Sequence, residues 1–156
     1  MKVVITGNSK KGLGKVIGKH FMNQGHEVSY IGKMTKEEAA QKINGCDIFV
    51  NNAYAPKGFQ AELLGLVQNN VKYSISIGSM ASTFPDRKNA AYTYDKRILQ
   101  NVHYNRCSVV RKNGPKHLLL SISGSSYKEK NTILKTIDFW LENPTFNEVK
   151  FSEVKR

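Results

Sequence analysis

Tyr92 and Lys96 are two side chains whose types and spacing could carry out proton transfer. Residues four apart on a helix lie next to each other on one face. A tyrosine hydroxyl has a reference pKa of about 10, which is too high for efficient acid–base chemistry at neutral pH. A neighbouring ammonium favours the phenolate and so lowers that pKa. The pair is therefore a candidate acid–base site, provided that a helix carries both residues.

A second candidate site is a turn that contains Gly7, Gly12 and Gly14. It lies between an expected strand at 2–6 and an expected helix at about 14–24. Glycines in such a turn let the backbone approach a pyrophosphate, and the following helix N-terminus offers free N–H groups and partial positive charge. The turn therefore predicts binding of a dinucleotide.

Apolar runs and helical periodicities alternate along the chain. We expect further strands at 27–32, 46–51, 72–77 and 116–123, with an edge strand near 148–152, and further helices at 35–44, 59–68, 90–111 and 132–142. This order predicts an α/β fold: a Rossmann-like three-layer αβα sandwich with a mainly parallel sheet of about 5–6 strands. No linker or repeat interrupts it, so we expect residues 1–156 to form a single dinucleotide-binding domain.

Two segments resemble motifs of the short-chain dehydrogenase/reductase family. TGNSKKGLG at 6–14 resembles the family's TGxxxGxG turn with one extra residue, and DIFVNNA at 47–53 resembles its NNAG segment, with Tyr54 replacing the last glycine. The resemblance implies a nicotinamide dinucleotide cofactor. It also implies that the cofactor-binding residues include Gly7, Asn8, Ser9, Lys10, Lys11, Gly12, Leu13, Gly14, Asn51, Asn52 and Ala53.

A third segment, SISIGSMAS at 74–82, resembles the family's strand that ends in the catalytic serine, at the usual offset from the tyrosine. The match points to Ser79, with Ser82 as the fallback. The resemblance implies that Ser79 hydrogen-bonds the substrate oxygen and that Tyr92 transfers its proton. Lys96 would bind the nicotinamide ribose and tune Tyr92, so that Tyr92 and Lys96 also contact the cofactor. Tyr94 competes with Tyr92, but no lysine follows it by four residues, and we expect it to pack.

The chain also departs from the family. Between Gly32 and Asp47 there is room for one helix only, so the family's third strand should be missing. Gln60 and Asn69 are poor candidates for the family's active-site asparagine. The loop at 127–131 is too short for a large substrate lid. The pocket is then either open or completed by a neighbouring subunit, with residues 86–89 as candidate lining.

The second expected strand ends in Tyr30-Ile31-Gly32-Lys33 and carries no acidic residue for the ribose hydroxyls of NAD. Lys33, together with Lys10 or Lys11, could instead pair with a 2′-phosphate. We therefore expect NADP(H) to be preferred, with NAD(H) as the alternative.

The composition limits the remaining classes of function. The net charge of the 156 residues is +12, which favours anionic partners, but the basic residues are scattered and nucleic acid binding is the weaker hypothesis. No apolar run approaches the ~20 residues of a membrane span, and the short apolar start does not resemble a signal peptide, so we expect a cytoplasmic protein. Cys46 and Cys107 should be reduced, buried thiols, and the four histidines lack ligand spacing, so we expect no metal.

We therefore predict an NADP(H)-dependent oxidoreductase that acts on a small carbonyl or alcohol substrate. A non-catalytic dinucleotide-binding sensor or regulatory protein is the main alternative, and a sugar-nucleotide epimerase or dehydratase is a weaker one. Because family members commonly form dimers or tetramers, we also expect a homodimer or homotetramer, with the helix at 90–111 as the interface candidate.

Overall fold

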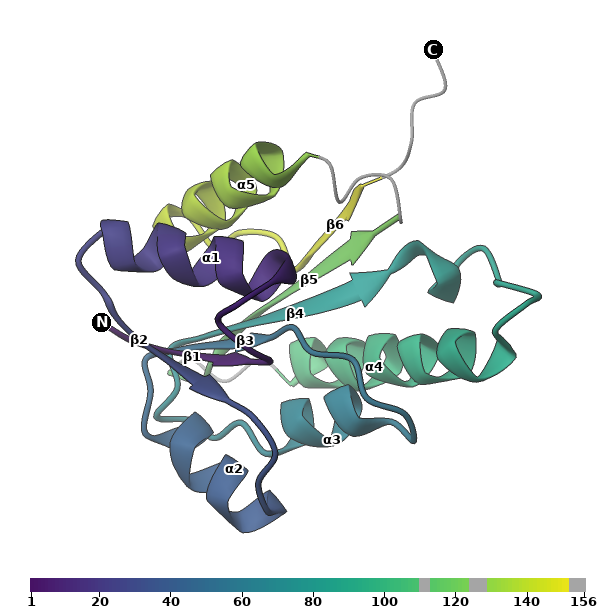
Figure 1. The fold of residues 1–156 in the computed structure, drawn as a ribbon, viewed down its shortest axis with the longest axis horizontal. Helices are drawn as coiled ribbons and strands as arrows, with labels where there is room; N and C mark the ends of the chain where they lie inside the picture. The colour runs from purple at the N-terminus through teal and green to yellow at the C-terminus, as the bar shows by residue number, and fades with distance from the viewer. Residues whose placement is uncertain (110–112, 124–128, 152–156) are drawn as a thin grey trace.

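A computed structural model describes residues 1–109, 113–123 and 129–151, and its centre is a six-stranded sheet (Figure 1). The strands lie in the order β2-β1-β3-β4-β5-β6, and every neighbouring pair is parallel. Their bounds are β1 (Lys2–Thr6), β2 (Glu27–Ile31), β3 (Ile48–Asn51), β4 (Tyr73–Ser79), β5 (Lys116–Ile122) and β6 (Glu148–Phe151). The predicted parallel α/β fold is confirmed.

Helices cover both faces of this sheet. Helices α1 (Gly12–Asn23) and α5 (Lys130–Glu142) lie on one face, and α2 (Lys36–Asn44), α3 (Phe59–Gly65) and α4 (Ala90–Ser108) lie on the other (Figure 1). The chain passes from β2 through α2 alone into β3, which pairs with β1 on the side away from β2. The strand that we expected to be missing at this point is therefore absent from the described residues.

Each face of the sheet has its own apolar core, because side chains along a strand alternate between faces. On one face, Ile5 and Val50 pack with Phe21 of α1 and Trp140 of α5. On the other, Val4, Phe49 and Leu119 pack with Ile43 of α2, Leu64 of α3 and Leu99 of α4. Burying each such side chain stabilises the fold by roughly 1.5–3 kcal/mol.

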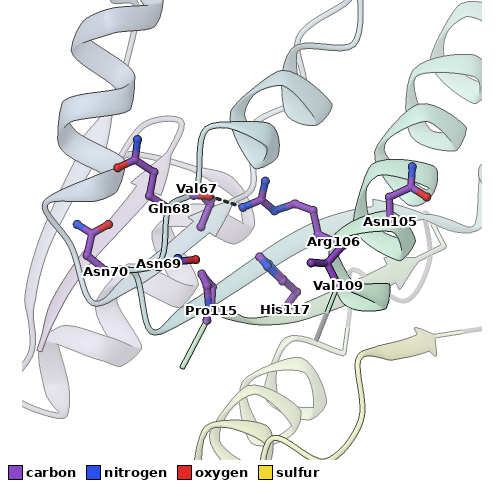
Figure 2. Close-up of a pocket in the computed structure, with 10 residues that line it drawn as sticks. Val67, Gln68, Asn69, Asn70, Asn105, Arg106, Val109, Pro115 and His117 are labelled. Carbon is purple, nitrogen blue, oxygen red and sulfur yellow. Dashed lines mark hydrogen bonds between the residues drawn. The ribbon is translucent and has the colours of Figure 1, made fainter. Parts of the chain in front are cut away.

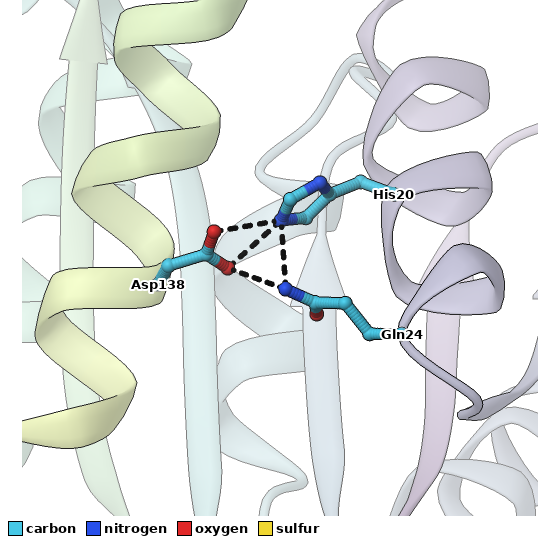
Figure 3. A network of polar contacts seen from close by, with 3 residues as sticks. All are labelled: His20, Gln24 and Asp138. Carbon is cyan, nitrogen blue, oxygen red and sulfur yellow. Dashed lines mark hydrogen bonds and ion pairs between the residues drawn. The ribbon is translucent and has the colours of Figure 1, made fainter.

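A polar network adds to the packing of α1 against α5 (Figure 3). Nε2 of His20 lies 2.8 Å from Oδ1 of Asp138, and Nε2 of Gln24 donates to the same oxygen at 3.1 Å. The three side chains are partly exposed, so we assign this network to the packing of the two helices rather than to chemistry.

Several element boundaries differ from the sequence-based prediction. Helix α3 ends at Gly65 rather than near residue 68, and β4 continues to Ser79, so that Ser79 is the last residue of the strand. Strand β3 begins at Ile48 instead of 46. Helix α4 ends at Ser108. Residues 110–112, 124–128 and 152–156, which include the ends of the expected helix and edge strand and most of the loop after β5, lie outside the described residues.

Helix α4 buries several polar side chains. Thr93, Lys96, Leu99 and His103 are buried, whereas Tyr94 is 64% exposed, so the prediction that it packs is wrong. The polar side chains can be buried because they find partners: the backbone N–H of Asp86, for example, donates to Oγ1 of Thr93 at 3.0 Å.

Three further features of the described residues bear on function. None of the helices is both long and apolar enough to span a membrane. Cys46 and Cys107 carry free thiols, as predicted, but only Cys46 is buried, because Cys107 lies partly exposed near the end of α4. Within the same residues, no group of three or more His, Cys, Asp or Glu side chains is arranged to hold a metal ion.

Candidate active site

The glycine turn brings the end of β1 against the start of α1. Gly7 has a φ of +117°, which favours glycine, and a Cβ added at Gly14 would lie 2.8 Å from Nδ2 of Asn52. Oδ1 of Asn8 accepts hydrogen bonds from the backbone N–H groups of Lys10 and Lys11, at 3.0 and 3.3 Å. This local turn accommodates the extra residue of the motif.

The N-terminus of α1 is open toward a ligand. Its N-cap residue, Lys11, makes no side-chain capping bond, and the first turn contains no acidic residue. The first N–H groups of a helix lack partners within the helix and attract anions. These N–H groups are the ones that a phosphate at this turn would meet.

The two asparagines at the end of β3 have different surroundings. The backbone N–H groups of Asn52 and Ala53 both donate to Oγ1 of Thr6, at 2.8 and 2.9 Å, which ties β3 to the glycine turn. Asn51 is completely buried, and its Nδ2 donates to the backbone carbonyl of Gln60 at 2.7 Å. Asn51 therefore supports the site from behind, and its side chain is not exposed to a ligand.

Two cavities lie on either side of this β3 end. One, of about 400 Å³, is mainly apolar and lies between the end of β2 and α3. Among the predicted cofactor residues, Gly7, Lys33 and Ala53 line it. Lys10 and Lys11 do not. An apolar cavity beside the glycine turn can accept a flat base such as adenine. The charged residues in its lining are Lys33, Lys36 and Glu62.

The second cavity, of about 670 Å³, is the candidate catalytic cleft. Ser79, Tyr92 and Lys96 all line it, together with Leu13 and Asn52 from the turn side. The structure thus brings together the three residues that were predicted from the sequence to be catalytic. Of residues 86–89, Asp86 lines the cleft, while Asn89 caps α4 by accepting a hydrogen bond from the backbone N–H of Tyr92.

The two candidate serines, Ser79 and Ser82, have different surroundings. Ser79 lines the cleft, and its Oγ accepts a hydrogen bond from the backbone N–H of Ala81 at 3.1 Å. Ser82 does not line it; its Oγ donates to the backbone carbonyl of Ser79 at 2.8 Å. Ser82 therefore holds the turn that follows β4, and Ser79 is the one of the two serines that faces the cleft.

Lys96 is only 4% exposed, and its Nζ donates to Oε1 of Gln60 at 2.5 Å and to the carbonyl of Ile77 at 3.0 Å. Burial lowers the pKa of Lys96 to about 8, against a smaller opposing effect of the Asp95 charge. Its Nζ also lies 5.5 Å from the centre of the Tyr92 ring. The positive charge is thus held next to the tyrosine.

Gln60 was set aside in the sequence analysis, yet it is the side chain that contacts Lys96. Gln60 lies on the buried side of α3 with Leu63 and Leu64, and a glutamine at such a position gives no sequence signal of which residue it contacts. Asn69, the other side chain considered, lines a different cavity, described below.

Tyr54, which replaces a motif glycine, also belongs to the cleft. Its ring packs edge-on against Tyr92 with a centroid distance of 4.9 Å, and its hydroxyl donates to Oδ2 of Asp95 at 2.9 Å. Desolvation, and then this hydrogen bond, raise the pKa of Tyr54 and keep its hydroxyl protonated. Oδ1 of Asp95 accepts from the backbone N–H of Gly58, so Asp95 fixes the loop that carries Tyr54.

Another cavity, of about 780 Å³, lies at the opposite end of the strands, beside the start of β5 (Figure 2). Arg106, Asn69 and His117 are among its lining residues, and Arg106 donates to the backbone carbonyl of Val67. None of the residues predicted for catalysis or cofactor binding lines this cavity. We therefore take the strand ends near Ser79 as the functional edge of the sheet.

Known proteins match this chain in structure but not in sequence. No protein-family model matches it, and no curated protein sequence does. Serine dehydrogenase from Escherichia coli superposes with a TM-score of 0.77 at 15% identity, covering 100% of this chain and 99% of that one. The chain has the fold of the short-chain dehydrogenases/reductases.

Two further short-chain dehydrogenase/reductase structures match over similar lengths. The 3-alpha-hydroxysteroid dehydrogenase from Pseudomonas sp. B-0831, complexed with NADH, has a TM-score of 0.73 at 15% identity and covers 96% of this chain and 95% of that one. A metagenomic short-chain oxidoreductase in complex with NADP has a TM-score of 0.71, also at 15% identity, covering 99% and 97%. Structures of this fold thus hold either dinucleotide.

Proposed function

We propose that this protein is a short-chain dehydrogenase/reductase that uses NADP(H) to interconvert a small carbonyl compound and its alcohol. The observation that carries the proposal is that Ser79, Tyr92 and Lys96 line one cleft. An apolar cavity that could hold a base lies on the other side of the glycine turn. Ser79, Tyr92 and Lys96 come from β4 and α4, so the fold itself assembles the group.

The residues present fit a nicotinamide dinucleotide. Gly14 leaves room for the side chain of Asn52, which packs against the turn, and α1 presents N–H groups there without a side-chain cap. Two lysines, Lys33 and Lys36, line the apolar cavity against one acid, Glu62, and Lys33 would meet the 2′-phosphate of NADP, which supports NADP(H) over NAD(H). When bound, the nicotinamide supplies or accepts the hydride.

In this mechanism the chain's own residues handle the proton and the substrate oxygen. Ser79 hydrogen-bonds the substrate oxygen and orients it. Tyr92 gives its proton to that oxygen in the reductive direction and takes it back in the oxidative one. Lys96, positively charged beside the Tyr92 ring, stabilises the negative charge that forms on the Tyr92 oxygen, and it binds the cofactor ribose.

The cleft favours an uncharged, apolar substrate. Besides the catalytic group, its lining includes Ile77, Met80, Phe84 and Ile122. The charged side chains among its described lining residues are Lys96, which is buried, and Asp86. Asp86 would repel an anionic substrate, so hydrophobic ketones and aldehydes are the class that we propose.

The test is an assay of NADPH oxidation with a panel of apolar ketones and aldehydes, including matched carboxylated analogues. We expect turnover of the uncharged compounds. Tyr92→Phe should lower kcat/KM by roughly 10²–10⁴-fold, whereas Tyr94→Phe, which alters an exposed ring on the same helix, should leave it unchanged. Absence of turnover across the panel, or full activity of Tyr92→Phe, would refute the proposed reaction.

One observation favours a second candidate, a dinucleotide-binding sensor without catalysis. The Tyr54 ring lies against Tyr92 and has Nζ of Lys96 5.6 Å from its centre, so it narrows the cleft where the family has glycine. Tight NADPH binding without turnover in the same panel would select this candidate. Tyr54→Gly should then bind NADPH at least as well as the unchanged protein.

We also propose that the protein acts as a homodimer through α4. Tyr94 and Tyr104 are large and exposed on this helix, and Tyr94→Glu should place a charge in such an interface. A molar mass of one chain for the unchanged protein, measured by light scattering, would contradict the dimer.

A further inference from the structure

Gln60 makes a closed set of hydrogen bonds that joins α3 to the strand ends of the catalytic cleft. Its Nε2 donates to the carbonyls of Asn51 and Ile77, at 3.0 and 3.2 Å, and its Oε1 accepts from Nζ of Lys96 at 2.5 Å. The reversed amide would place N–H groups against an ammonium and an oxygen against two carbonyls. The partners therefore fix the orientation of this buried amide.

Lys96 is held from two sides by this arrangement. The carbonyl of Ile77 accepts from Nζ of Lys96 as well as from Gln60, so the three groups form a triangle. An ammonium has three N–H donors. Two are used here, and the third has no hydrogen-bond acceptor among the described residues, while the rings of Tyr54 and Tyr92 lie within 5.6 Å of Nζ.

The side chain that holds Lys96 is a neutral amide, so it does not cancel the positive charge of the ammonium. No carboxylate in the described part of the chain lies within ion-pair distance of Lys96; the neighbouring Asp95 carboxylate instead accepts from Tyr54 and Gly58. A carboxylate in place of the amide would cancel the positive field at the cleft. An amide directs the ammonium and leaves its charge acting on Tyr92.

We infer that Gln60 is a positioning residue: its amide clamps the ammonium of Lys96 so that one N–H and the full positive charge face the cleft. This inference rests on the proposed function for the use of that N–H, which is to bind the cofactor ribose. The clamp itself is a property of Gln60 and Lys96 alone, and it can be measured without cofactor.

The experiment compares Gln60→Glu and Gln60→Met with Gln68→Met, which removes an exposed glutamine distant from the cleft. Lysine-labelled protein is titrated by NMR, and the Lys96 signal is identified by its loss in Lys96→Met. We expect the pKa of Lys96 to rise in Gln60→Glu, because a carboxylate favours the ammonium, and to fall below the unchanged protein's value in Gln60→Met. Gln68→Met should leave it unchanged.

NADPH affinity, measured by calorimetry on the same folded variants, provides the functional readout. Both Gln60 variants should bind about tenfold more weakly than the unchanged protein. A Lys96 pKa that does not move in either variant overturns the clamp, and unaltered NADPH affinity in both variants overturns the use of the free N–H for the cofactor ribose. If the unchanged protein binds no NADPH, the proposed function fails, and the order of the three Lys96 pKa values still decides whether Gln60 holds the ammonium.

Discussion

Lys96 and His117 are both buried bases, and they lie near opposite ends of the paired strands β4 and β5. Lys96 is 4% exposed and His117 is 8% exposed, yet the pKa of Lys96 is lowered to about 8 and that of His117 to about 4. At neutral pH the first therefore stays mostly charged and the second is neutral.

The difference lies in what surrounds each base. Nζ of Lys96 has two acceptors, the amide of Gln60 and the carbonyl of Ile77. Nδ1 of His117 has no hydrogen-bond partner among the described residues, and besides burial the nearby Arg106 and His103 lower its pKa further. Of these two bases, only Lys96, which has acceptors, keeps its positive charge at neutral pH, and it lies at the edge that we assign to catalysis.

The largest expected effect is that of Lys96→Met, which should lower kcat/KM by roughly 10³-fold while raising the free energy of unfolding at pH 7 by about 1 kcal/mol. This gain in stability equals the desolvation cost of the ammonium that is removed, less the cost of leaving Oε1 of Gln60 without its donor.

The same residue predicts a pH dependence. Because the pKa of Lys96 in the folded chain lies below the unfolded value of 10.5, the stability of the unchanged protein should rise between pH 8 and 10.5.

This rise should be missing in Lys96→Met. Denaturant unfolding at several pH values measures both the higher stability of Lys96→Met at pH 7 and the absence of the rise at alkaline pH. A variant that is inactive and also several kcal/mol less stable would mean that Lys96 is a structural residue and would remove the contrast with His117.

His117→Gln is the matching change at the other end of the strands. The pKa of His117 is depressed from 6.5 to about 4 in the folded chain, so the unfolded chain binds a proton first as the pH falls. The unchanged protein should therefore lose about 3 kcal/mol of stability between pH 6.5 and 4 through this residue. His117→Gln should lack that part of the loss, which the difference between the two unfolding curves at pH 7 and pH 4.5 isolates.

Activity provides the second half of this comparison. Turnover at pH 7 should be unchanged in His117→Gln, because the variant alters only the end of the sheet away from the cleft. A large loss of activity would contradict the assignment of the two ends.

At the functional edge itself we expect a smaller difference in kcat/KM, between Ser79→Ala and Ser82→Ala. Ser79→Ala removes the hydroxyl that orients the substrate oxygen and should lower kcat/KM by about 10²-fold. Ser82→Ala removes only the bond to the carbonyl of Ser79, and should cost about 1 kcal/mol of stability while leaving the rate nearly unchanged. Steady-state kinetics and thermal unfolding on the pair decide which serine acts.

Much of the fold and of the candidate site could be predicted from the sequence, because the alternation of apolar strands and helices determines the order of the elements. The short interval between Gly32 and Asp47 predicted the missing strand, and the order of the motifs placed Ser79, Tyr92 and Lys96 at one edge. Parallel strands bring their carboxyl ends together, so residues at strand ends can be grouped without coordinates.

The rest depended on tertiary contacts that leave no local signal. The contact of Gln60 with Lys96 arises from how α3 lies against α4, and apolar periodicity cannot show it. For the same reason the buried face of α4 was mispredicted at Tyr94, since its buried positions at Thr93 and Lys96 are polar and are stabilised by hydrogen bonds.

The most direct test of the central claim is a calorimetric titration of the purified protein with NADPH and with NADH, repeated on Lys33→Glu. We predict that NADPH binds more tightly than NADH, and that Lys33→Glu weakens NADPH binding by roughly tenfold while leaving NADH binding nearly unchanged. If neither dinucleotide binds, the glycine turn and the cleft beside it do not form a cofactor site, and the account of Ser79, Tyr92 and Lys96 as a catalytic group is contradicted.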